Sequence, residues 1–182
     1  MIGARLRRFG RRLARGFRRE DGTATIEFVF VVPIVLTIFM ASMESGLYMI
    51  RHVMMERALD LVMREFRLGR LGTVTHDQLR NLICDASPYL SDCRSVLKVS
   101  LEPIDTTTWK MPATPPTCVD RGGTIENEPT FKSGDENEIM VVRICAIQDP
   151  IFPTTGLGLE LKSDSQGGYQ MIAATIFVNE PS

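Results

Sequence analysis

The sequence has few of the side chains from which enzyme active sites are usually built. Its 182 residues include only two histidines, His52 and His76, and neither lies in a nucleophile or metal-binding motif. A general base that works near neutral pH is usually a histidine or a carboxylate with a shifted pKa. The pair His76-Asp77 is better explained as the start of a helix, and glycine motifs for phosphates or dinucleotides are missing. We therefore predict no catalytic residue, no cofactor and no enzymatic activity.

The sequence also lacks the cysteine spacing of a zinc site. None of its four cysteines are separated by two residues, and all four follow the apolar segment 26–43; they are Cys84, Cys93, Cys118 and Cys145. An even number of cysteines outside the cytoplasm favours disulfides over metal, and a metal at Cys84 and Cys93 is the less favoured alternative. The acidic run 135–138 matches no calcium-binding loop, so we interpret it as a solvated turn and predict no metal.

Acidic residues are scarce at the N-terminus. Residues 1–22 contain eight arginines and two acids, a net charge of +6, whereas 23–182 hold 13 bases and 20 acids, a net charge of −7. A basic tail of this kind suits an anionic partner. Because an apolar segment follows at once, lipid headgroups explain the arginines more simply than nucleic acid does. We predict a basic cytoplasmic leader, either disordered or a basic amphipathic helix, and no nucleic-acid partner.

The apolar segment from Ile26 to Met43 is long enough to cross a membrane. At ~1.5 Å per residue it extends ~27 Å, close to the thickness of a bilayer's hydrocarbon core. The arginines on its N-terminal side place the N-terminus in the cytoplasm and the C-terminus outside. Pro33 lies in the middle of the segment and is expected to kink or loosen the helix. Membrane lipid is therefore a predicted partner.

The helix is predicted to continue well beyond the membrane. Residues 44–68 contain no proline and one glycine, and Gly69 and Gly72 provide the stop signal. This gives one helix of roughly 45 residues, ~68 Å long. Apolar residues recur in its second half at helical spacing and predict the face that packs on the rest of the protein: Leu47, Ile50, Met54, Ala58, Leu61, Met63 and Phe66.

The remainder of the chain predicts a small sheet. A short helix should run from Thr75 or Asp77 to about Ala86, and three strands are expected at residues 95–102, 138–147 and 169–178. The proline-rich stretch 103–138 is read as a long loop pinned by Trp109, and 157–161 as a possible short helix. Disulfides Cys84–Cys93 and Cys118–Cys145 would tie the loops down. The predicted class is α+β, with the long helix packed on about three antiparallel strands joined by long loops.

The start of the apolar segment carries a processing motif. Gly22 is followed five residues later by Glu27, then by Phe28 and an apolar helix, which is the pattern of a prepilin cleavage site. Residues 24–33, Ala-Thr-Ile-Glu-Phe-Val-Phe-Val-Val-Pro, resemble the TadE-like family of pseudopilins from tight-adherence (Flp-type) pilus systems. The resemblance extends in outline over residues 20–182, and the segments that carry it are Glu44-Ser-Gly46, Ile83-Cys84 with Cys93, the run 138–143 and the ending Asn179-Glu-Pro181. Cys118 and Cys145 depart from the family pattern.

The resemblance implies a site of processing and assembly. A membrane-embedded prepilin peptidase would cut between Gly22 and Thr23, and the new amine of Thr23 would pair with Glu27 of its own or an adjacent subunit. The implied partners are this peptidase, other pilins and pseudopilins, and the inner-membrane pilus platform. The expected function is that of a minor pseudopilin in the initiation or assembly of an adhesive type IV pilus. The alternative is a signal-anchored periplasmic scaffold or binding protein that is never cut.

The expected organisation has three parts. Residues 1–22 form the cytoplasmic leader, 23–48 the transmembrane half of the long helix, and 49–182 a periplasmic pilin-like domain. The protein is expected to pass once through the bacterial inner membrane, with the N-terminus in the cytoplasm. After processing, the extracellular pilus is a further expected location. The loop of Trp109 is a candidate surface for subunit contacts.

Overall fold

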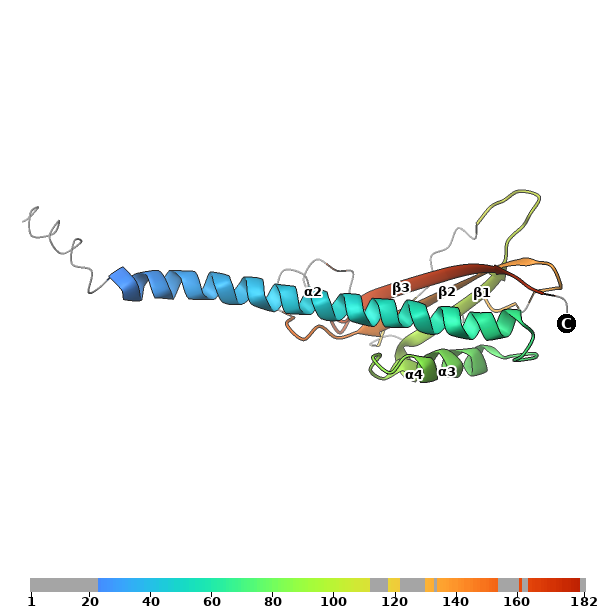
Figure 1. Cartoon of the computed structure of the whole chain (residues 1–182), viewed down its shortest axis with the longest axis horizontal. Helices are drawn as coiled ribbons and strands as arrows, with labels where there is room; N and C mark the ends of the chain where they lie inside the picture. The colour runs from blue at the N-terminus through green and yellow to red at the C-terminus, as the bar shows by residue number, and fades with distance from the viewer. Residues whose placement is uncertain are drawn as a thin grey trace, which may run out of the picture. The chain divides into compact units, whose positions relative to one another are not determined.

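The computed structural model describes residues 23–111, 118–121, 130–132, 134–153, 161 and 164–180. Its elements follow in the order α2 (Thr23–Arg67), α3 (His76–Ala86), α4 (Cys93–Val96), β1 (Leu97–Pro103), β2 (Ile139–Gln148) and β3 (Tyr169–Val178) (Figure 1). The structure divides into two compact units, the first ending at Ser42 and the second beginning at Met43. The domain boundary expected after residue 48, between the transmembrane half of the helix and the periplasmic domain, stays a prediction.

The first unit contains the apolar part of α2. Among the described residues, α2 is the one helix long and apolar enough to cross a membrane, and none of its most apolar stretch is buried. The helix continues through Pro33, whose carbonyl accepts a hydrogen bond from the Thr37 hydroxyl at 2.5 Å. Large apolar side chains such as Phe28 and Phe39 are exposed. A helix whose apolar surface is exposed all round is typical of membrane anchoring.

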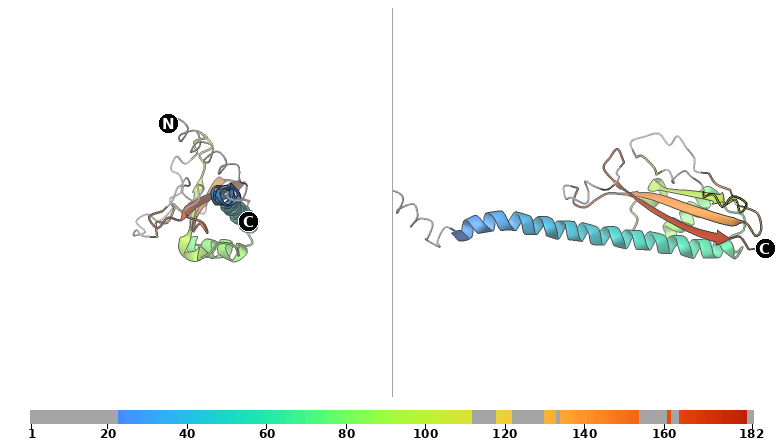
Figure 2. Two further views of the ribbon diagram at one scale, coloured as in Figure 1. Left: turned by 90° about the vertical axis from the view of Figure 1, so that its left-hand side faces the viewer. Right: turned by 90° about the horizontal axis from the view of Figure 1, so that it is seen from above.

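The second unit is built on a three-stranded antiparallel sheet in the order β1-β2-β3. The second half of α2 runs along β3, which places Tyr48 next to Tyr169 and Phe66 next to Phe177, with ring centroids 5.3 and 5.7 Å apart (Figure 2). These pairs lie at the two ends of β3, so helix and strand run in the same direction. The predicted α+β class, with a long helix on one face of three antiparallel strands, is confirmed.

The face of α2 that packs on the sheet differs in part from the predicted one. Ala58, Met63 and Phe66 are buried as predicted, but Ile50 and Leu61 are exposed. The core instead takes Met55, Leu59 and Val62. Positions 55, 59, 62 and 66 form one stripe on a helix of 3.6 residues per turn. This helix carries apolar residues on more than one side, so spacing alone did not identify the stripe that contacts the sheet.

The ends of the helices follow the predicted signals. Gly69 and Gly72 have φ angles of +67° and +59°, a conformation that glycine adopts without steric cost and that ends α2. Thr75 caps α3, because its hydroxyl accepts from the Gln78 amide N–H while the Gln78 side chain accepts from the Thr75 N–H. The capped helix presents Leu79 and Ile83 to the core.

Three smaller predictions have different outcomes. The strand expected at 95–102 begins at Leu97, because Cys93–Val96 form the single turn α4. Trp109 does not pin its loop to the domain: its side chain is 68% exposed, on a turn where Asp105 accepts from Thr107 and Thr108. The helix expected at 157–161 lies outside the described residues except for Leu161.

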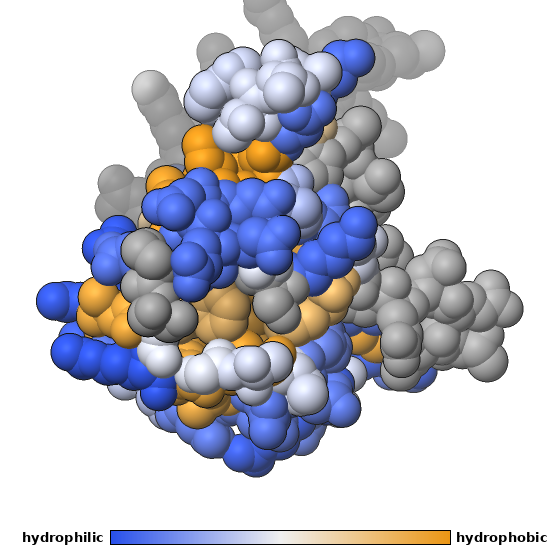
Figure 3. Space-filling model, turned by 90° about the vertical axis from the view of Figure 1, so that its right-hand side faces the viewer, coloured by the Kyte–Doolittle hydropathy of each residue, from blue (hydrophilic) through white to orange (hydrophobic). Residues whose placement is uncertain are grey.

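The end of the second unit at which α2 and β3 finish has a mostly polar surface. Figure 3 shows this end covered largely by hydrophilic residues, with smaller apolar areas between them. Arg67, the last residue of α2, forms an ion pair with Glu180 at 3.2 Å. The exposed apolar side chains of α2 are concentrated instead in its N-terminal half.

Candidate functional site: the N-terminal half of α2 and the β2–β3 connection

The predicted cleavage site lies at the start of the described chain. Gly22 lies outside the described residues, and Thr23 is the first residue of α2. Glu27 is one turn into the helix with its side chain exposed, and Ile26 and Phe28 beside it are exposed as well. Processing after Gly22 and the pairing of Glu27 with the Thr23 amine stay predictions.

A second carboxylate, Glu44, directly follows the apolar segment and is held quite differently. Its side chain is only 1% exposed. Its Oε2 atom accepts hydrogen bonds from the backbone N–H groups of Ile151 and Phe152, both at 2.9 Å. Hydrogen bonds to an ionised acceptor are stronger than those between neutral groups. Glu44 therefore fastens the connection between β2 and β3 to the helix.

Arg51 makes a second link to the same connection. It lies seven residues after Glu44, two turns along the helix and on nearly the same side. Its Nη1 donates to the Asp149 carbonyl at 3.0 Å and to the Tyr169 hydroxyl at 2.6 Å. Burial raises the pKa of Tyr169 above its ordinary value, and the hydrogen bond from Arg51 partly opposes this effect. The phenol is therefore protonated at neutral pH.

A second arginine, Arg121, joins the two ends of the connection between β2 and β3. Arg121 contacts Asp149 and Asp164, each at 2.7 Å. Its hydrogen bond lowers the pKa of Asp164 to about 2, and the two carboxylates raise the pKa of Arg121. A Cβ atom on Gly168 would lie 2.3 Å from Arg121 Nη2, so glycine leaves the room that this arginine occupies.

The polar groups around Arg51 and Arg121 line a pocket of about 350 Å³, together with Gln148 and Asp149. Both arginines already bind protein oxygens, Arg51 the Asp149 carbonyl and Arg121 two carboxylates. Charges satisfied in this way hold neighbouring segments together and offer little to an anionic ligand. The pocket is therefore best explained as part of the support for the β2–β3 connection.

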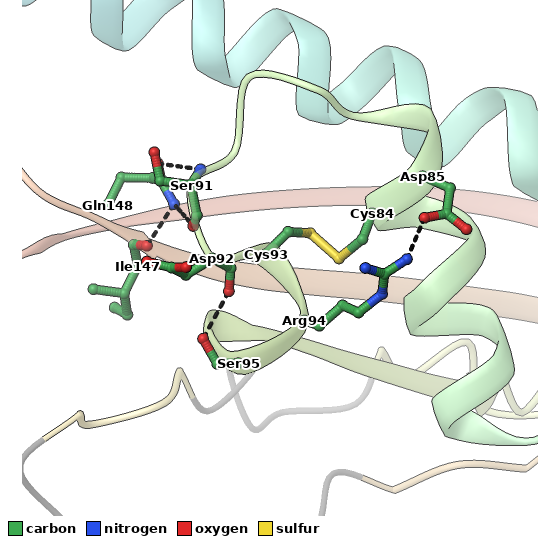
Figure 4. Close-up of a disulfide and its surroundings, with 9 residues drawn as sticks. All are labelled: Cys84, Asp85, Ser91, Asp92, Cys93, Arg94, Ser95, Ile147 and Gln148. Atoms are coloured by element: carbon green, nitrogen blue, oxygen red, sulfur yellow. Dashed lines mark hydrogen bonds and ion pairs between the residues drawn. A yellow bond between two sulfur atoms is a disulfide. The ribbon is translucent and has the colours of Figure 1, made fainter.

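The first disulfide, Cys84–Cys93, joins the end of α3 to the start of α4, with the Cα atoms 5.6 Å apart (Figure 4). Beside it, the Gln148 side chain accepts from the Ser91 N–H at 3.1 Å and donates to the Ser91 carbonyl at 3.0 Å. Gln148 is buried at the end of β2. The disulfide closes the loop between α3 and α4, and the pair of hydrogen bonds fastens this loop to the sheet.

The second disulfide joins Cys118 to Cys145, with the Cα atoms 5.2 Å apart. Cys145 is fully buried on the central strand β2, so the bond fixes one point of the long loop to the middle of the sheet. Two disulfides in a small unit fit a domain outside the cytoplasm, where thiols are not kept reduced. Each bond also stabilises the fold by restricting the unfolded chain.

His76 and Asp77, the pair considered for catalysis, lie at the start of a helix. His76 Nδ1 lies 3.2 Å from Asp77 Oδ1, at the capped start of α3, and its ring meets the edge of Phe131. Within the described ranges, no group of three or more histidine, cysteine, aspartate or glutamate side chains could hold a metal ion. The arrangement at His76 is that of a helix start packed against a neighbouring loop.

Sequence reasoning missed the role of Glu44. A carboxylate immediately after an apolar run is a signal that it needs a partner. Its partners are N–H groups more than a hundred residues away, however, and no local pattern identifies them. The arginine links were missed for the same reason, because Arg121 and Asp164 belong to loops that are distant in sequence.

Comparison with known protein families adds one finding. Residues 22–64 match the family model for TadE-like protein, a stretch that begins at Gly22 and includes most of α2. Comparison with curated proteins and with solved structures gives no match. The TadE-like family is a pilin family, not a family of enzymes, and it suggests partners within the Tad pilus machinery. Residues 22–64 thus form a domain similar to the TadE-like family, whose members are pilin-like proteins associated with the Tad pilus.

Proposed function

We propose that this chain is a minor pseudopilin of a tight-adherence (Flp-type) pilus. A prepilin peptidase cuts it after Gly22, and the mature chain takes part in the initiation or assembly of the adhesive filament. The observation that carries the proposal is the TadE-like match, which begins at Gly22 and continues along α2. Its partners are the peptidase, other pilins and pseudopilins, and the inner-membrane platform.

The chemistry of the first turns of α2 supports this role. Cleavage would remove the +6 leader and create an amine at Thr23, one turn before Glu27. A carboxylate inside an apolar helix is costly unless it finds a partner. The amine of Thr23, from the same or an adjacent subunit, is a partner of opposite charge within reach. Such a pair would set the depth at which one subunit packs against the next.

The second unit supports a location outside the cytoplasm. Its two disulfides require an oxidising compartment, and the arginines before α2 favour a cytoplasmic N-terminus. We infer a single pass through the inner membrane, with the folded unit in the periplasm and, after processing, in the pilus. The exposed turn of Trp109 remains a candidate surface for contacts with other subunits.

The proposal is tested by the mass of the protein extracted from membranes that contain the cognate prepilin peptidase. We expect a mature chain that starts at Thr23, found by intact mass and N-terminal sequencing. Gly22→Leu should abolish this shortening, because a side chain at that position blocks a protease site shaped for glycine. Gly16→Leu, which changes another glycine of the leader, is the matched control and should be processed normally.

The opposite result identifies the alternative function. A chain that keeps Met1–Gly22 in the presence of an active peptidase contradicts the pseudopilin proposal. It would instead support a signal-anchored periplasmic scaffold or binding protein that stays in the membrane.

A further inference from the structure

The connection between β2 and β3 contains four consecutive residues without a free backbone N–H group. Pro150 and Pro153 have no N–H at all, because their nitrogens are closed into rings. The N–H groups of Ile151 and Phe152 both donate to Glu44 Oε2. A backbone N–H that lacks an acceptor is costly to take out of water. In the segment Pro150–Pro153, every backbone N–H group therefore has an acceptor.

The side chains of the same segment are apolar, and two of them, Ile151 and Pro153, are exposed. Ile151 is 51% exposed, although its own N–H is bound to a buried carboxylate. The segment is also fixed from behind, because the Asp149 carbonyl that precedes it accepts from Arg51. The protein therefore holds an exposed apolar side chain in a defined place, on a segment tethered to α2.

Glu44 sets the level of the segment Pro150–Pro153 along α2. It is the first residue after the apolar segment 26–43, which is long enough to cross the hydrocarbon core, and one residue of helix corresponds to only ~1.5 Å. The N–H groups of Ile151 and Phe152 contact Glu44 itself. The segment is therefore held at the first turn of the helix beyond the apolar span, the level of the lipid headgroups.

We propose that Pro150–Pro153 is a membrane-surface contact, with Ile151 inserted at the boundary between headgroups and acyl chains of the bilayer that α2 spans. The lipid is the occupant because the segment is tied to the helix where the helix leaves the bilayer, so lipid lies beside it whether or not another protein is present. An apolar segment with satisfied N–H groups enters this boundary without exposing unpaired donors. The inference rests on membrane anchoring by α2 but not on cleavage after Gly22.

Tryptophan fluorescence can report on a single position, because Trp109 is the only tryptophan in the sequence and can be removed. In the full-length Trp109→Phe protein, one new tryptophan is introduced, by Ile151→Trp in the test protein and by Ile176→Trp in the control protein. Ile176 has the same 51% exposure as Ile151. It pairs with Val141, near one end of the sheet. The segment Pro150–Pro153 follows the other end, where Gln148 pairs with Tyr169. Both chains are reconstituted at low protein density in vesicles of phosphatidylcholine brominated near the headgroup.

Bromine should quench the tryptophan of the Ile151→Trp chain and leave that of the Ile176→Trp chain almost unchanged. We expect roughly a twofold loss of emission at position 151, as for an aromatic ring at the headgroup level. Adding Glu44→Ala to the Ile151→Trp chain should reduce the quenching, because it frees the two N–H groups, whereas Glu44→Gln keeps an acceptor and most of the quenching. Circular dichroism checks that each variant is folded.

Three results would overturn the inference, and they differ in whether they also reject the membrane anchoring. Vesicle flotation with equal quenching in the Ile151→Trp and Ile176→Trp chains rejects the membrane contact alone, as does quenching that depends on protein density. Failure of the protein to float with the vesicles rejects both the contact and the membrane anchoring in the proposed function. Retention of the leader does not bear on the contact, because cleavage is not needed for it.

Discussion

The two halves of α2 belong to one helix, but they differ in whether the protein itself buries their apolar side chains. Before Ser42, none of the most apolar stretch is buried by the protein; after Met43, one stripe is buried against the sheet and the opposite side is exposed. Their two glutamates repeat the contrast: Glu27 is exposed, whereas Glu44 is buried and binds two N–H groups. The first half needs a partner from outside the chain, and the second already has its partner within it.

This difference separates assembly from folding along a single helix. Most of the stability of a helix in a protein comes from packing rather than from intrinsic propensity. Substitutions after Met43 should therefore change the free energy of unfolding of the second unit. Substitutions before Ser42 should leave that free energy unchanged and act on insertion and assembly.

The largest effect should come from Glu27→Ala, which tests the assembly side of the comparison. If Glu27 pairs with a Thr23 amine away from water, losing one partner costs about 3–5 kcal/mol of subunit interaction. We expect normal cleavage by intact mass but a near-complete loss of surface pili, counted by electron microscopy. Thr25→Ala, two residues earlier on the same helix, should keep its pili. Normal piliation in the Glu27→Ala strain would refute the assembly role.

The next effect sharpens the comparison on the folding side, using the same substitution in each half. Leu59 is almost fully buried in the core, and Leu36 is exposed. Leu59→Ala should reduce the free energy of unfolding by about 3 kcal/mol, through lost apolar burial and the cavity left behind. Leu36→Ala should change it very little. Denaturant titration in detergent micelles, followed by circular dichroism, measures both, and equal shifts would remove the distinction between the halves.

The smallest of these effects concerns Glu44. Glu44→Ala leaves two backbone N–H groups without an acceptor and should destabilise the second unit by about 2 kcal/mol. Glu44→Gln keeps an oxygen in the same place and should cost clearly less. Backbone hydrogen exchange at Ile151 and Phe152 gives a local readout, because both amides should exchange faster in the alanine variant. Unchanged protection there would mean that Glu44 does not hold the connection.

Much of the fold was predictable because its signals are local. The absence of proline between Pro33 and Gly69 and the glycines at 69 and 72 set the length of α2, and β3 occupies the predicted residues 169–178. The strands are rich in β-branched residues, and strands that follow one another in the chain pair antiparallel in the sheet. The predicted cysteine pairs are both bonded in the structure.

The remaining features depend on contacts between distant residues. The apolar spacing of α2 fitted more than one face, so Leu61 was expected in the core and Leu59 was not; only the position of the sheet decides between them. Trp109 was expected to pin its loop to the domain, but its side chain is exposed on a turn that Asp105 stabilises. The partners of Glu44 could not be identified from sequence, since they are loop N–H groups with no side-chain signature.

The two grips on the β2–β3 connection have a mechanical consequence. Glu44 and Arg51 lie two turns apart on one side of α2, and both bind the stretch from Asp149 to Phe152. A rotation of α2 about its own axis at this level would break both sets of hydrogen bonds unless the loop moved with it. The connection therefore couples the helix to the sheet. Torque applied to the helix beyond Met43 is passed to β2 and β3, and the sheet turns with the helix.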